Sequence, residues 1–208
     1  MSGKKCIIFA AGDFDGNIVK NDGDVIIAAD AGYRHLEKIG VQPDILLGDF
    51  DTIGKVPEHE NIIPFPPEKD YTDTELALIE GIKLGFDDFL ICGAIGGKRL
   101  EHTLGNLSLA ASYSQRGYAM TLTDGDYIVK AVTDSCVTFD ENEKGFISVF
   151  CISGKAQGVS ISGLKYTLND ATLDASNPTL CISNEFIGEK AEISVKHGTI
   201  LIMWQKRK

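Results

Sequence analysis

Residues 24–51 read DVIIAADAGYRHLEKIGVQPDILLGDFD, and this stretch decides the fold. Its apolar run Asp24–Ala29 predicts a buried strand, Ala31–Ile39 predicts a short helix that ends at Gly40, and Asp44–Leu47 predicts a second strand. Continuous apolar strands that alternate with helices are typical of a parallel sheet covered on both faces. The stretch therefore predicts a strand–helix–strand unit of an α/β domain.

The same alternation extends on both sides of this unit. Further buried strands are predicted at Lys5–Ala10, Asn61–Ile63, Asp88–Cys92 and Tyr118–Thr123, and further helices at Thr72–Leu84 and Leu100–Ser112. The expected N-terminal domain is thus a mostly parallel sheet with helices on both faces.

Beyond about residue 125 the pattern changes to short strands separated by Gly, Asn and Asp. The predicted strands are Tyr127–Val132, Cys136–Phe139, Phe146–Cys151, Gly158–Ile161, Thr179–Ile182, Ala191–Val195 and Ile200–Trp204. No helical period of useful length occurs there, which is typical of an all-β sandwich. We expect an α/β domain over residues 1–128 and a β-sandwich domain over residues 129–208.

Charge supports this division and limits the partners. Residues 1–140 hold 23 acidic and 12 basic side chains, whereas residues 141–208 hold 7 and 8. The net charge of −10 over 208 residues repels nucleic acid and anionic lipid. No apolar run approaches the ~18 residues that a membrane span needs. Five cysteines without metal-ligand spacing fit a reducing environment, so we expect a soluble, cytoplasmic protein.

Acidic residues follow the predicted strands where these strands end. They are Asp30, Asp49, Asp51, Asp70, Asp73 and Glu101. Ligands of open parallel sheets bind at the carboxyl ends of the strands, and hard carboxylate oxygens suit Mg²⁺. The Asp49-Phe-Asp51 spacing would put both carboxylates on one side of an extended segment. Acidic residues also collect at exposed strand ends without any function. Each Asp taken singly could therefore be an ordinary surface residue.

The segment Lys69-Asp-Tyr-Thr-Asp-Thr-Glu75 contains a capping box, in which Thr72 caps a helix and Glu75 follows three residues later. The box explains Thr72 and Glu75 but not Lys69, Asp70 and Asp73. Because a helix N-terminus offers free N–H groups, capping and phosphate binding can coexist here.

The segment Gly93-Ala-Ile-Gly-Gly-Lys-Arg99 is a glycine loop between a strand and a helix. Its glycines allow a ligand to approach the backbone, and Lys98 and Arg99 can pair with phosphate. The spacing is not that of a P-loop, and an ordinary turn is an equal alternative. His102 and Asn106 follow on one face of the next helix.

Together these residues resemble the thiamine pyrophosphokinase family. The resemblance rests on Asp30-Ala-Gly32, Pro43-Asp-Ile-Leu-Leu-Gly-Asp-Phe-Asp-Thr52, Lys69-Asp-Tyr-Thr-Asp73, Gly93 to His102 with Asn106, Gly163-Leu-Lys-Tyr166 and Ile182-Ser-Asn184. The motifs occur in the family's order along nearly the whole chain. The sequence departs from the family's pattern at Thr52, where Ser is usual, at Tyr166, where Trp is common, and at Glu101, where Asp is usual.

The resemblance implies transfer of pyrophosphate from ATP, the co-substrate, to the hydroxyl of thiamine, which gives thiamine diphosphate and AMP. It implies Mg²⁺ ligands at Asp49, Asp51, Asp73 and Glu101, with Asp49, Asp51, Asp73 and Arg99 as the catalytic set. It implies ATP contacts at Asp30, Lys69, Asp70, Thr72, Arg99, His102 and Asn106, and thiamine contacts at Tyr166, Ser183 and Asn184. It also implies a homodimer with its sites at the interface.

Two alternatives come from other functional classes. Asp49-Phe-Asp-Thr-Ile53 nearly matches the DxDx[TV] motif of haloacid-dehalogenase-type phosphatases, in which Asp49 would be the nucleophile. The other alternative is a nucleotide or thiamine sensor without catalysis, although a sensor needs fewer carboxylates.

Overall fold

The structure is a computed structural model that describes residues 3–50, 59–152 and 154–206. The chain forms two compact units, the first from Met1–Asn106 with Leu122–Gly125 and the second from Leu107–Thr121 with Asp126–Lys208. The expected boundary between residues 128 and 129 stays a prediction.

The first unit contains the predicted parallel sheet. Its strands are β1 (Cys6–Phe9), β2 (Val25–Ala29), β3 (Ile45–Gly48), β4 (Ile62–Pro64) and β5 (Asp88–Cys92). They lie in the order β5-β1-β2-β3-β4, and Ile7 of β1 is paired with both Ile26 and Leu90. The helices are α1 (Tyr33–Ile39), α2 (Asp73–Lys83) and α3 (Leu100–Gln115), which runs on into the second unit; β6 (Ala119–Thr123) follows it.

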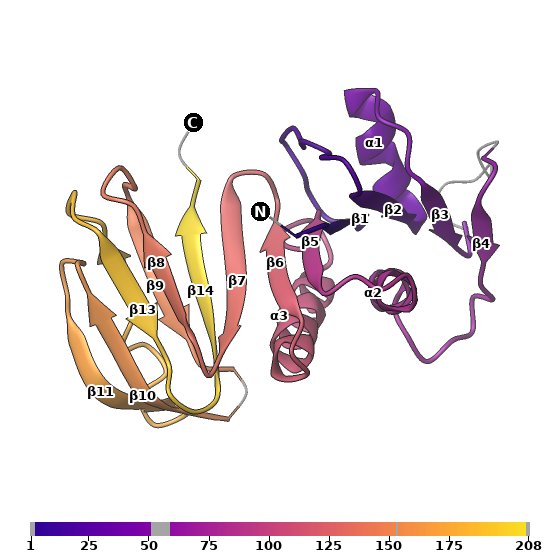
Figure 1. Ribbon diagram of the computed structural model, residues 1–208. Coiled ribbons are helices and arrows are strands. Elements are labelled where there is room, and N and C mark those ends of the chain that lie inside the picture. Colours follow the sequence, from indigo (N-terminus) through magenta and orange to yellow (C-terminus); the bar gives the residue numbers. More distant parts are fainter. Residues whose placement is uncertain (1–2, 51–58, 153, 207–208) are drawn as a thin grey trace. The chain divides into compact units, whose positions relative to one another are not determined.

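Helices cover both faces of this sheet, as the continuous apolar strands predict. Figure 1 shows α1 above and α2 below the strands. Ile7 and Phe9 pack with Leu36 of α1 in one core cluster. On the other face α2 lies so close that a Cβ on its Gly81 would come within 2.7 Å of Cys6 Sγ. Alternate residues of β1 therefore serve the two faces, which fixes the strand in the middle of three layers.

The helix expected at Ala31–Ile39 begins later than predicted. Asp30–Gly32 form a 3-10 turn, η1, and α1 follows from Tyr33. Asp30, just before the expected start, has a left-handed φ of 43°, which a regular helix does not contain. The C-terminus agrees with the prediction, because Gly40 adopts the left-handed conformation typical of a helix end.

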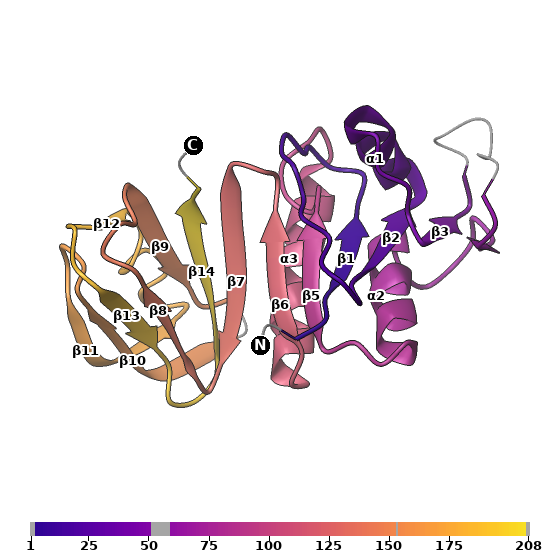
Figure 2. The same ribbon diagram turned by 45° about the horizontal axis from the view of Figure 1, so that its top comes forward.

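The second unit is the predicted β-sandwich (Figure 2). One of its layers has the order β12-β9-β14-β7 and the other the order β11-β10-β13-β8. The bounds are β7 (Tyr127–Thr133), β8 (Cys136–Phe139), β9 (Phe146–Phe150), β10 (Lys155–Ser162), β11 (Leu168–Asp174), β12 (Asn184–Glu185), β13 (Ala191–Ser194) and β14 (Thr199–Gln205). The pairings within both layers are antiparallel.

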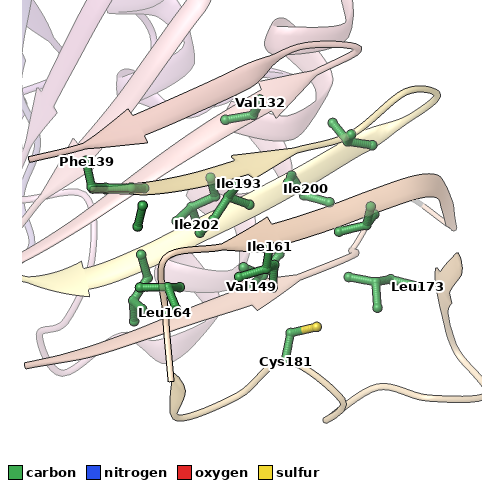
Figure 3. Packing of buried hydrophobic residues seen from close by; sticks show 14 of the residues in the cluster. Val132, Phe139, Val149, Ile161, Leu164, Leu173, Cys181, Ile193, Ile200 and Ile202 are labelled. Carbon is green, nitrogen blue, oxygen red and sulfur yellow. The ribbon is translucent and has the colours of Figure 1, made fainter. Parts of the chain in front are cut away.

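The core of the sandwich comes from both layers. Figure 3 shows Ile200 and Ile202 of β14 beside Ile161 of β10 and Ile193 of β13. These four side chains are at most 3% exposed. Their burial between two sheets explains the alternating burial pattern along β10 and β13.

One strand prediction in this unit was wrong, and two strands, β11 and β12, were missed. Thr179–Ile182 is a run of turns, and its Leu180 and Ile182 are 53% and 39% exposed instead of packed in a sheet. Strand β11 was missed, because LNDATLD carries the Asn and Asp that usually mark turns. It forms nonetheless at the end of a layer, where it pairs only with β10.

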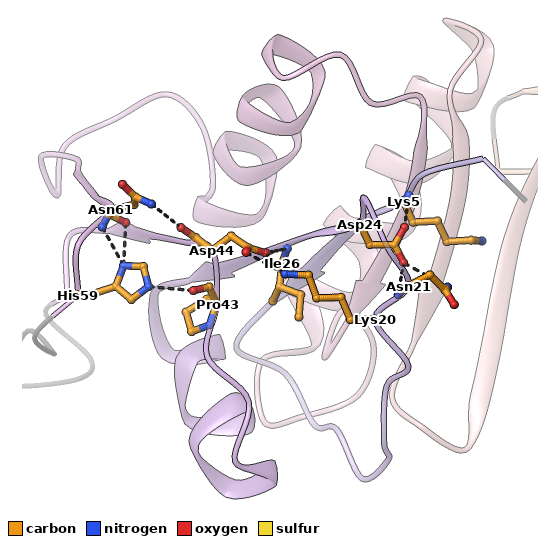
Figure 4. Close-up of polar contacts among 9 residues, drawn as sticks. All are labelled: Lys5, Lys20, Asn21, Asp24, Ile26, Pro43, Asp44, His59 and Asn61. Atoms are coloured by element: carbon orange, nitrogen blue, oxygen red, sulfur yellow. Dashed lines mark hydrogen bonds and ion pairs between the residues drawn. The ribbon is translucent and has the colours of Figure 1, made fainter.

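Two aspartates hold the amino ends of the first strands (Figure 4). Asp24 is buried and accepts hydrogen bonds from Lys5 N at 2.7 Å and Asn21 N at 2.9 Å. Asp44 accepts from Ile26 N at 2.7 Å and also pairs with Lys20. Each carboxylate thus satisfies a backbone donor at the start of β1 or β2.

No helix in the described ranges is both long and apolar enough to cross a membrane. Cys6 and Cys92 are buried in the first unit, and burial raises the pKa of each thiol to about 12. The two side chains therefore act as small hydrophobes, as their apolar neighbours in the sequence predict.

The network around Asp24 predicts a pH-dependent stability. Burial alone would raise the pKa of Asp24, but the hydrogen bonds from Lys5 and Asn21 outweigh burial and hold that pKa below its usual value. Because the pKa of Asp24 is lower in the folded chain than in the unfolded chain, its charge stabilises the fold at any pH above the unfolded pKa of ~3.9. This stabilisation is lost as the pH falls through the pKa of the folded chain. We expect Asp24→Asn to lower the free energy of unfolding by about 1–3 kcal/mol at pH 7.

Urea denaturation of both proteins between pH 3 and pH 7 would measure this effect. The gap between wild type and variant should shrink below about pH 4. The same change at exposed Asp22 should alter stability by less than about 0.5 kcal/mol. A gap that is independent of pH would contradict a role for the Asp24 charge.

Candidate active site

A cavity of about 560 Å³ lies in the first unit at the carboxyl ends of β1, β2, β3 and β5. The chain leaves β1 towards β2 on one side, while β5 lies on its other side. This reversal of strand order is the switch point at which open α/β sheets bind ligands. The cavity therefore lies where the predicted fold requires a site.

Backbone forms the floor of the cavity where the loops after β1 and β5 touch. Gly12 N donates to Gly93 O at 2.8 Å, and a Cβ on Gly12 would lie 2.5 Å from that oxygen. A Cβ on Gly93 would in turn lie 2.5 Å from Ala10 O. Only glycines allow this approach, which leaves the space above it open to a ligand.

Two predicted aspartates enter the cavity from the ends of β2 and β3. Asp30 and Asp49 both line it, and Asp30 is 7% exposed. Asp30 itself has a φ of 43°, and Phe50, which follows Asp49, has a φ of 60°. Left-handed backbone at residues other than glycine costs about 1–3 kcal/mol and clusters at functional sites.

The left-handed Phe50 corrects one expectation. The Asp49-Phe-Asp51 segment is not extended at its centre, so the argument that alternation places both carboxylates on one side does not apply. Asp51 lies outside the described residues, and its predicted role stays a prediction.

Lys69 joins the two acidic elements of the site. Its Nζ lies 3.0 Å from Asp49 Oδ2 and 2.7 Å from Asp73 Oδ1, and its side chain is only 13% exposed. Burial alone would lower the pKa of Lys69, but the hydrogen bonds to Asp73 and Asp49 raise it above the ordinary lysine value. The ammonium is therefore charged at neutral pH and balances part of the acidic cluster.

The N-terminus of α2 forms another wall. Thr72 caps the helix by accepting from Glu75 N at 3.2 Å, which confirms half of the predicted capping box. Thr72, Asp73 and Thr74 line the cavity. Asp70 is exposed and is not among the residues that line the cavity. Of the two acids in the segment 69–73, Asp73 is therefore the one that reaches the cavity.

The glycine loop supplies the basic side of the cavity. Lys98, Arg99 and His102 line it together with Gly96 and Gly97. Asn106, also at the cavity, is buried and donates from Nδ2 to Ala94 O at 2.7 Å, which ties α3 to the loop.

Glu101 lies away from the other predicted ligands. Its Oε1 accepts from Arg99 Nε at 2.8 Å, both side chains are about 70% exposed, and Glu101 is not among the lining residues. The hydrogen bond from Arg99 lowers the pKa of Glu101. Its predicted metal role stays a prediction, and a change of rotamer would be needed to fulfil it.

Sequence reasoning missed two charged residues of the cavity, Asp13 and Arg34. Asp13 follows β1 as Asp30 follows β2, so the rule that found the other acids could have found it. Arg34 stands on α1, one turn after Asp30, within a helix without a recognisable motif.

The described residues contain no cluster of three or more acid, His or Cys side chains that could hold a metal ion. Asp49 and Asp73 are nevertheless two hard donors around one cation, the Lys69 ammonium. Mg²⁺ is held in proteins by one or two carboxylates together with substrate phosphates. The chemistry of this pair therefore fits a magnesium ion that arrives with a phosphorylated ligand.

The predicted thiamine contacts lie in the sandwich unit. Asn184 is 4% exposed, and its amide is engaged with backbone: Oδ1 accepts from Tyr166 N at 3.0 Å and from Glu185 N at 2.9 Å, and Nδ2 donates to Tyr166 O at 2.7 Å. Tyr166 itself is 62% exposed. Ser183 is also exposed and has a left-handed φ of 60°. Asn184 thus holds the backbone that presents Tyr166 to solvent.

The cavity as a whole has opposite charges on its two sides. Most of the aspartates come from the ends of β2 and β3 and from α2, and most of the cations come from the loop after β5; the exceptions are Asp13 after β1 and Arg34 on α1. Such a cavity can hold a polyanion on its basic side and a cation between the polyanion and the acids.

Comparisons with known proteins point to one family. A family model described as "Thiamin pyrophosphokinase, catalytic domain" matches residues 17–122, and "Thiamin pyrophosphokinase, vitamin B1 binding domain" matches residues 135–200. A thiamine pyrophosphokinase of Bacillus subtilis is 32% identical over 184 residues, which are 85% of each chain. A crystal structure of a thiamin pyrophosphokinase family protein from Enterococcus faecalis has a TM-score of 0.81 and 26% identity, with 99% of this chain and 100% of that one covered.

The bridge at Lys69 predicts a local stability effect. Lys69→Met would leave Asp49 and Asp73 close together without their shared cation. We expect the free energy of unfolding to fall by about 1–3 kcal/mol, since removing one partner leaves largely buried charges unbalanced. Lys83→Met is the matched control. The Lys83 side chain is 64% exposed, so its ion pair with Glu80 should stabilise the fold by about 0.5 kcal/mol or less. Equal losses in the two variants, measured by urea denaturation, would refute the bridge.

Proposed function

The chain belongs to the thiamine pyrophosphokinase family, and we propose on this basis that it transfers pyrophosphate from ATP to the hydroxyl of thiamine, giving thiamine diphosphate and AMP. The observation that carries the proposal is the cavity at the switch point, which opposes Asp49 and Asp73 to a basic glycine loop. The relatives and the motif order support the same activity.

The triphosphate of ATP lies along the basic side of the cavity in this proposal. Lys98, Arg99 and His102 neutralise its oxygens, and the N-terminus of α2 at Thr72 offers backbone N–H groups. Asn106 keeps α3 and the loop together through Ala94 O. Asp30 lies on the acidic side, near the nucleotide or its metal.

Mg²⁺ would be held by Asp49 and Asp73, with Asp51 and Glu101 as the further predicted ligands. Bound there, Mg²⁺ would withdraw charge from the phosphate oxygens and fix their geometry. Lys69 is not among the residues that line the cavity, and it keeps Asp49 and Asp73 together through its two ion pairs.

The thiamine oxygen attacks the β-phosphorus of ATP, the bond from this phosphorus to the oxygen of AMP breaks, and the hydroxyl proton is released. Little covalent chemistry falls to the protein, so its contribution is positioning and charge neutralisation. The cationic loop residues stabilise the charge that develops on the transferred group and on AMP.

The phosphatase alternative finds no support. The family model that covers residues 17–122 describes a different enzyme. Asp49 follows the third strand in the chain, and its carboxylate is bound to Lys69. A carboxylate held in this way is a poor nucleophile and a good partner for cations.

Product analysis tests the proposed activity directly. With ATP, Mg²⁺ and thiamine, the protein should form thiamine diphosphate and AMP in equal amounts, and excess chelator should abolish the reaction. Chromatography with authentic standards would identify the products. ADP with thiamine monophosphate would reject pyrophosphate transfer, and phosphate release from simple esters without thiamine would restore the phosphatase.

The thiamine site involves the sandwich unit in this proposal. Tyr166 and Ser183 are exposed there, and the aromatic ring of Tyr166 offers a stacking surface to the cationic thiamine rings. Asn184 acts mainly through the backbone of Tyr166, since its amide is engaged at three hydrogen bonds.

Substitutions at these positions should affect the two substrates unequally. Asn184→Ala and Tyr166→Ala should both raise the KM for thiamine by about 10-fold or more, while the KM for ATP changes little. Steady-state kinetics with each substrate varied in turn gives both constants. The matched control is Asn142→Ala, which removes an exposed amide elsewhere in the sandwich. Equal increases in the two KM values would remove Asn184 and Tyr166 from the thiamine site.

The sandwich also supports the expected homodimer with sites at its interface. Large side chains are exposed on neighbouring segments around β9 and β12: Phe146 and Tyr166 are each 62% exposed, and Ile187 is 49% exposed. Exposed apolar groups of this kind mark interaction surfaces. A reducing, cytoplasmic location remains the expectation from the free cysteines.

Sedimentation velocity tests the dimer. The full chain should sediment as a dimer at micromolar concentration, and Phe146→Asp should shift it towards the monomer because a charge would be buried at the interface. Glu141→Lys, an exposed change on the preceding loop, is the control. A fully active wild-type monomer would contradict shared sites.

A further inference from the structure

Asp13 makes a contact that neither the motifs nor the proposed roles include. Its Oδ2 accepts a hydrogen bond from Gly97 N at 2.8 Å, although the two residues are 84 positions apart in the chain. Asp13 follows β1 and Gly97 follows β5, so the contact spans the two loops at the switch point. Both residues line the cavity.

The segment that carries Asp13 is fixed on both sides. Before it, Gly12 N donates to Gly93 O at 2.8 Å; after it, Asp15 N donates to Asp124 O at 2.8 Å. Phe14 is buried, with its ring 5.3 Å from that of Phe9. The backbone that carries Asp13 is therefore held in place on both sides, although the Asp13 side chain itself is exposed.

The loop that Asp13 contacts needs such a tie. Gly96 and Gly97 have φ values of 77° and 83°, and consecutive glycines have the widest choice of backbone conformations. The next two residues are Lys98 and Arg99, whose side chains line the cavity. Besides the bond to Asp13, this turn is held by a hydrogen bond that Thr103 Oγ1 donates to Gly96 O at 3.2 Å. The direction in which Lys98 and Arg99 leave the backbone thus depends on how Gly97 is held.

A direct contact between Asp13 and a polyanion is unfavourable, because the carboxylate repels phosphate oxygens. Its hydrogen bond to a backbone N–H is charge-assisted and therefore stronger than a neutral one. The carboxylate is thus suited to hold the loop rather than the ligand.

We propose that Asp13 is a positioning residue, which fixes Gly97 and thereby orients Lys98 and Arg99 towards the phosphates of the nucleotide. The inference depends on the proposed function only for the identity of the anion. The contact between Asp13 and Gly97 is independent of that function. Asp13 acts through an acceptor oxygen. Asparagine should therefore substitute for it without loss of function, because its Oδ1 can accept the same hydrogen bond.

The test compares Asp13→Ala with Asp13→Asn, and Asp15→Ala serves as the matched control. Asp15 is exposed, and its backbone N–H makes the bond to Asp124, so Asp15→Ala removes a neighbouring negative charge without removing that bond. Asp13→Ala should raise the KM for ATP about 10-fold, with the KM for thiamine nearly unchanged. Asp13→Asn and Asp15→Ala should stay within about twofold of wild type, and all four proteins should melt within a few degrees of one another.

Amide hydrogen exchange on the ligand-free chain gives a readout besides activity. Exchange at Gly97 and Lys98 should be at least about tenfold faster in Asp13→Ala than in wild type and should be restored in Asp13→Asn. If the protein formed no thiamine diphosphate, the proposed function would fail while this measurement would still decide the loop contact.

Three results would overturn the inference. If Asp13→Asn raised the KM for ATP as much as Asp13→Ala, the negative charge, and not the acceptor oxygen, would be needed. A lower KM for ATP in Asp13→Ala would show that the carboxylate only repels the nucleotide. Unchanged exchange at Gly97 in Asp13→Ala would show that the hydrogen bond does not hold the loop.

Discussion

The close approach of two backbones at the switch point is the constraint on which the rest of the site depends. Gly12 and Gly93 touch through a hydrogen bond of 2.8 Å, and neither position has room for a side chain. This contact brings the loop after β1 against the loop after β5. This part of the cavity wall is therefore backbone, whereas the charged groups come from the neighbouring strand ends, from α1 and α2 and from the glycine loop.

The arrangement of charge follows from this geometry. Parallel strands end at one edge, so the aspartates that follow β2 and β3 necessarily gather there together with Asp73 of α2. Such crowding is tolerated because Lys69 lies between Asp49 and Asp73 and because the cationic loop occupies the other side. Two of the described residues other than glycine with left-handed backbone, Asp30 and Phe50, stand at these strand ends, where the directions of the side chains matter most.

Sequence patterns predicted the architecture well where one local rule decided the outcome. The apolar runs found β1, β2, β3 and β5, and the capping rule found the start of α2 at Thr72. They failed where tertiary pairing decides: β11 is a polar strand that forms because β10 offers it an edge. The mostly apolar segment Thr179–Ile182 folds as turns, although Val149 N of β9 donates to its Cys181 O. In the site, Asp49 and Asp73 were found from motifs, whereas Asp13 was missed although it follows β1 as Asp30 follows β2. Its contact with Gly97 could not be predicted, because the proximity of β1 and β5 is not apparent from their order in the chain. The roles given to Ser183, Asn184 and Glu101 remain predictions that rest on resemblance.

The position of Lys69 also determines how the acidic cluster responds to its ionic surroundings. A carboxylate cluster in water normally collects free counter-ions, whose release when a ligand binds makes the affinity depend on salt. Here the counter-ion is part of the chain, since the ammonium already lies within 3.0 Å of both Asp49 and Asp73. A cation that enters between them displaces a tethered group instead of dissolved ions. The exchange therefore depends on the reach of one side chain more than on ionic strength.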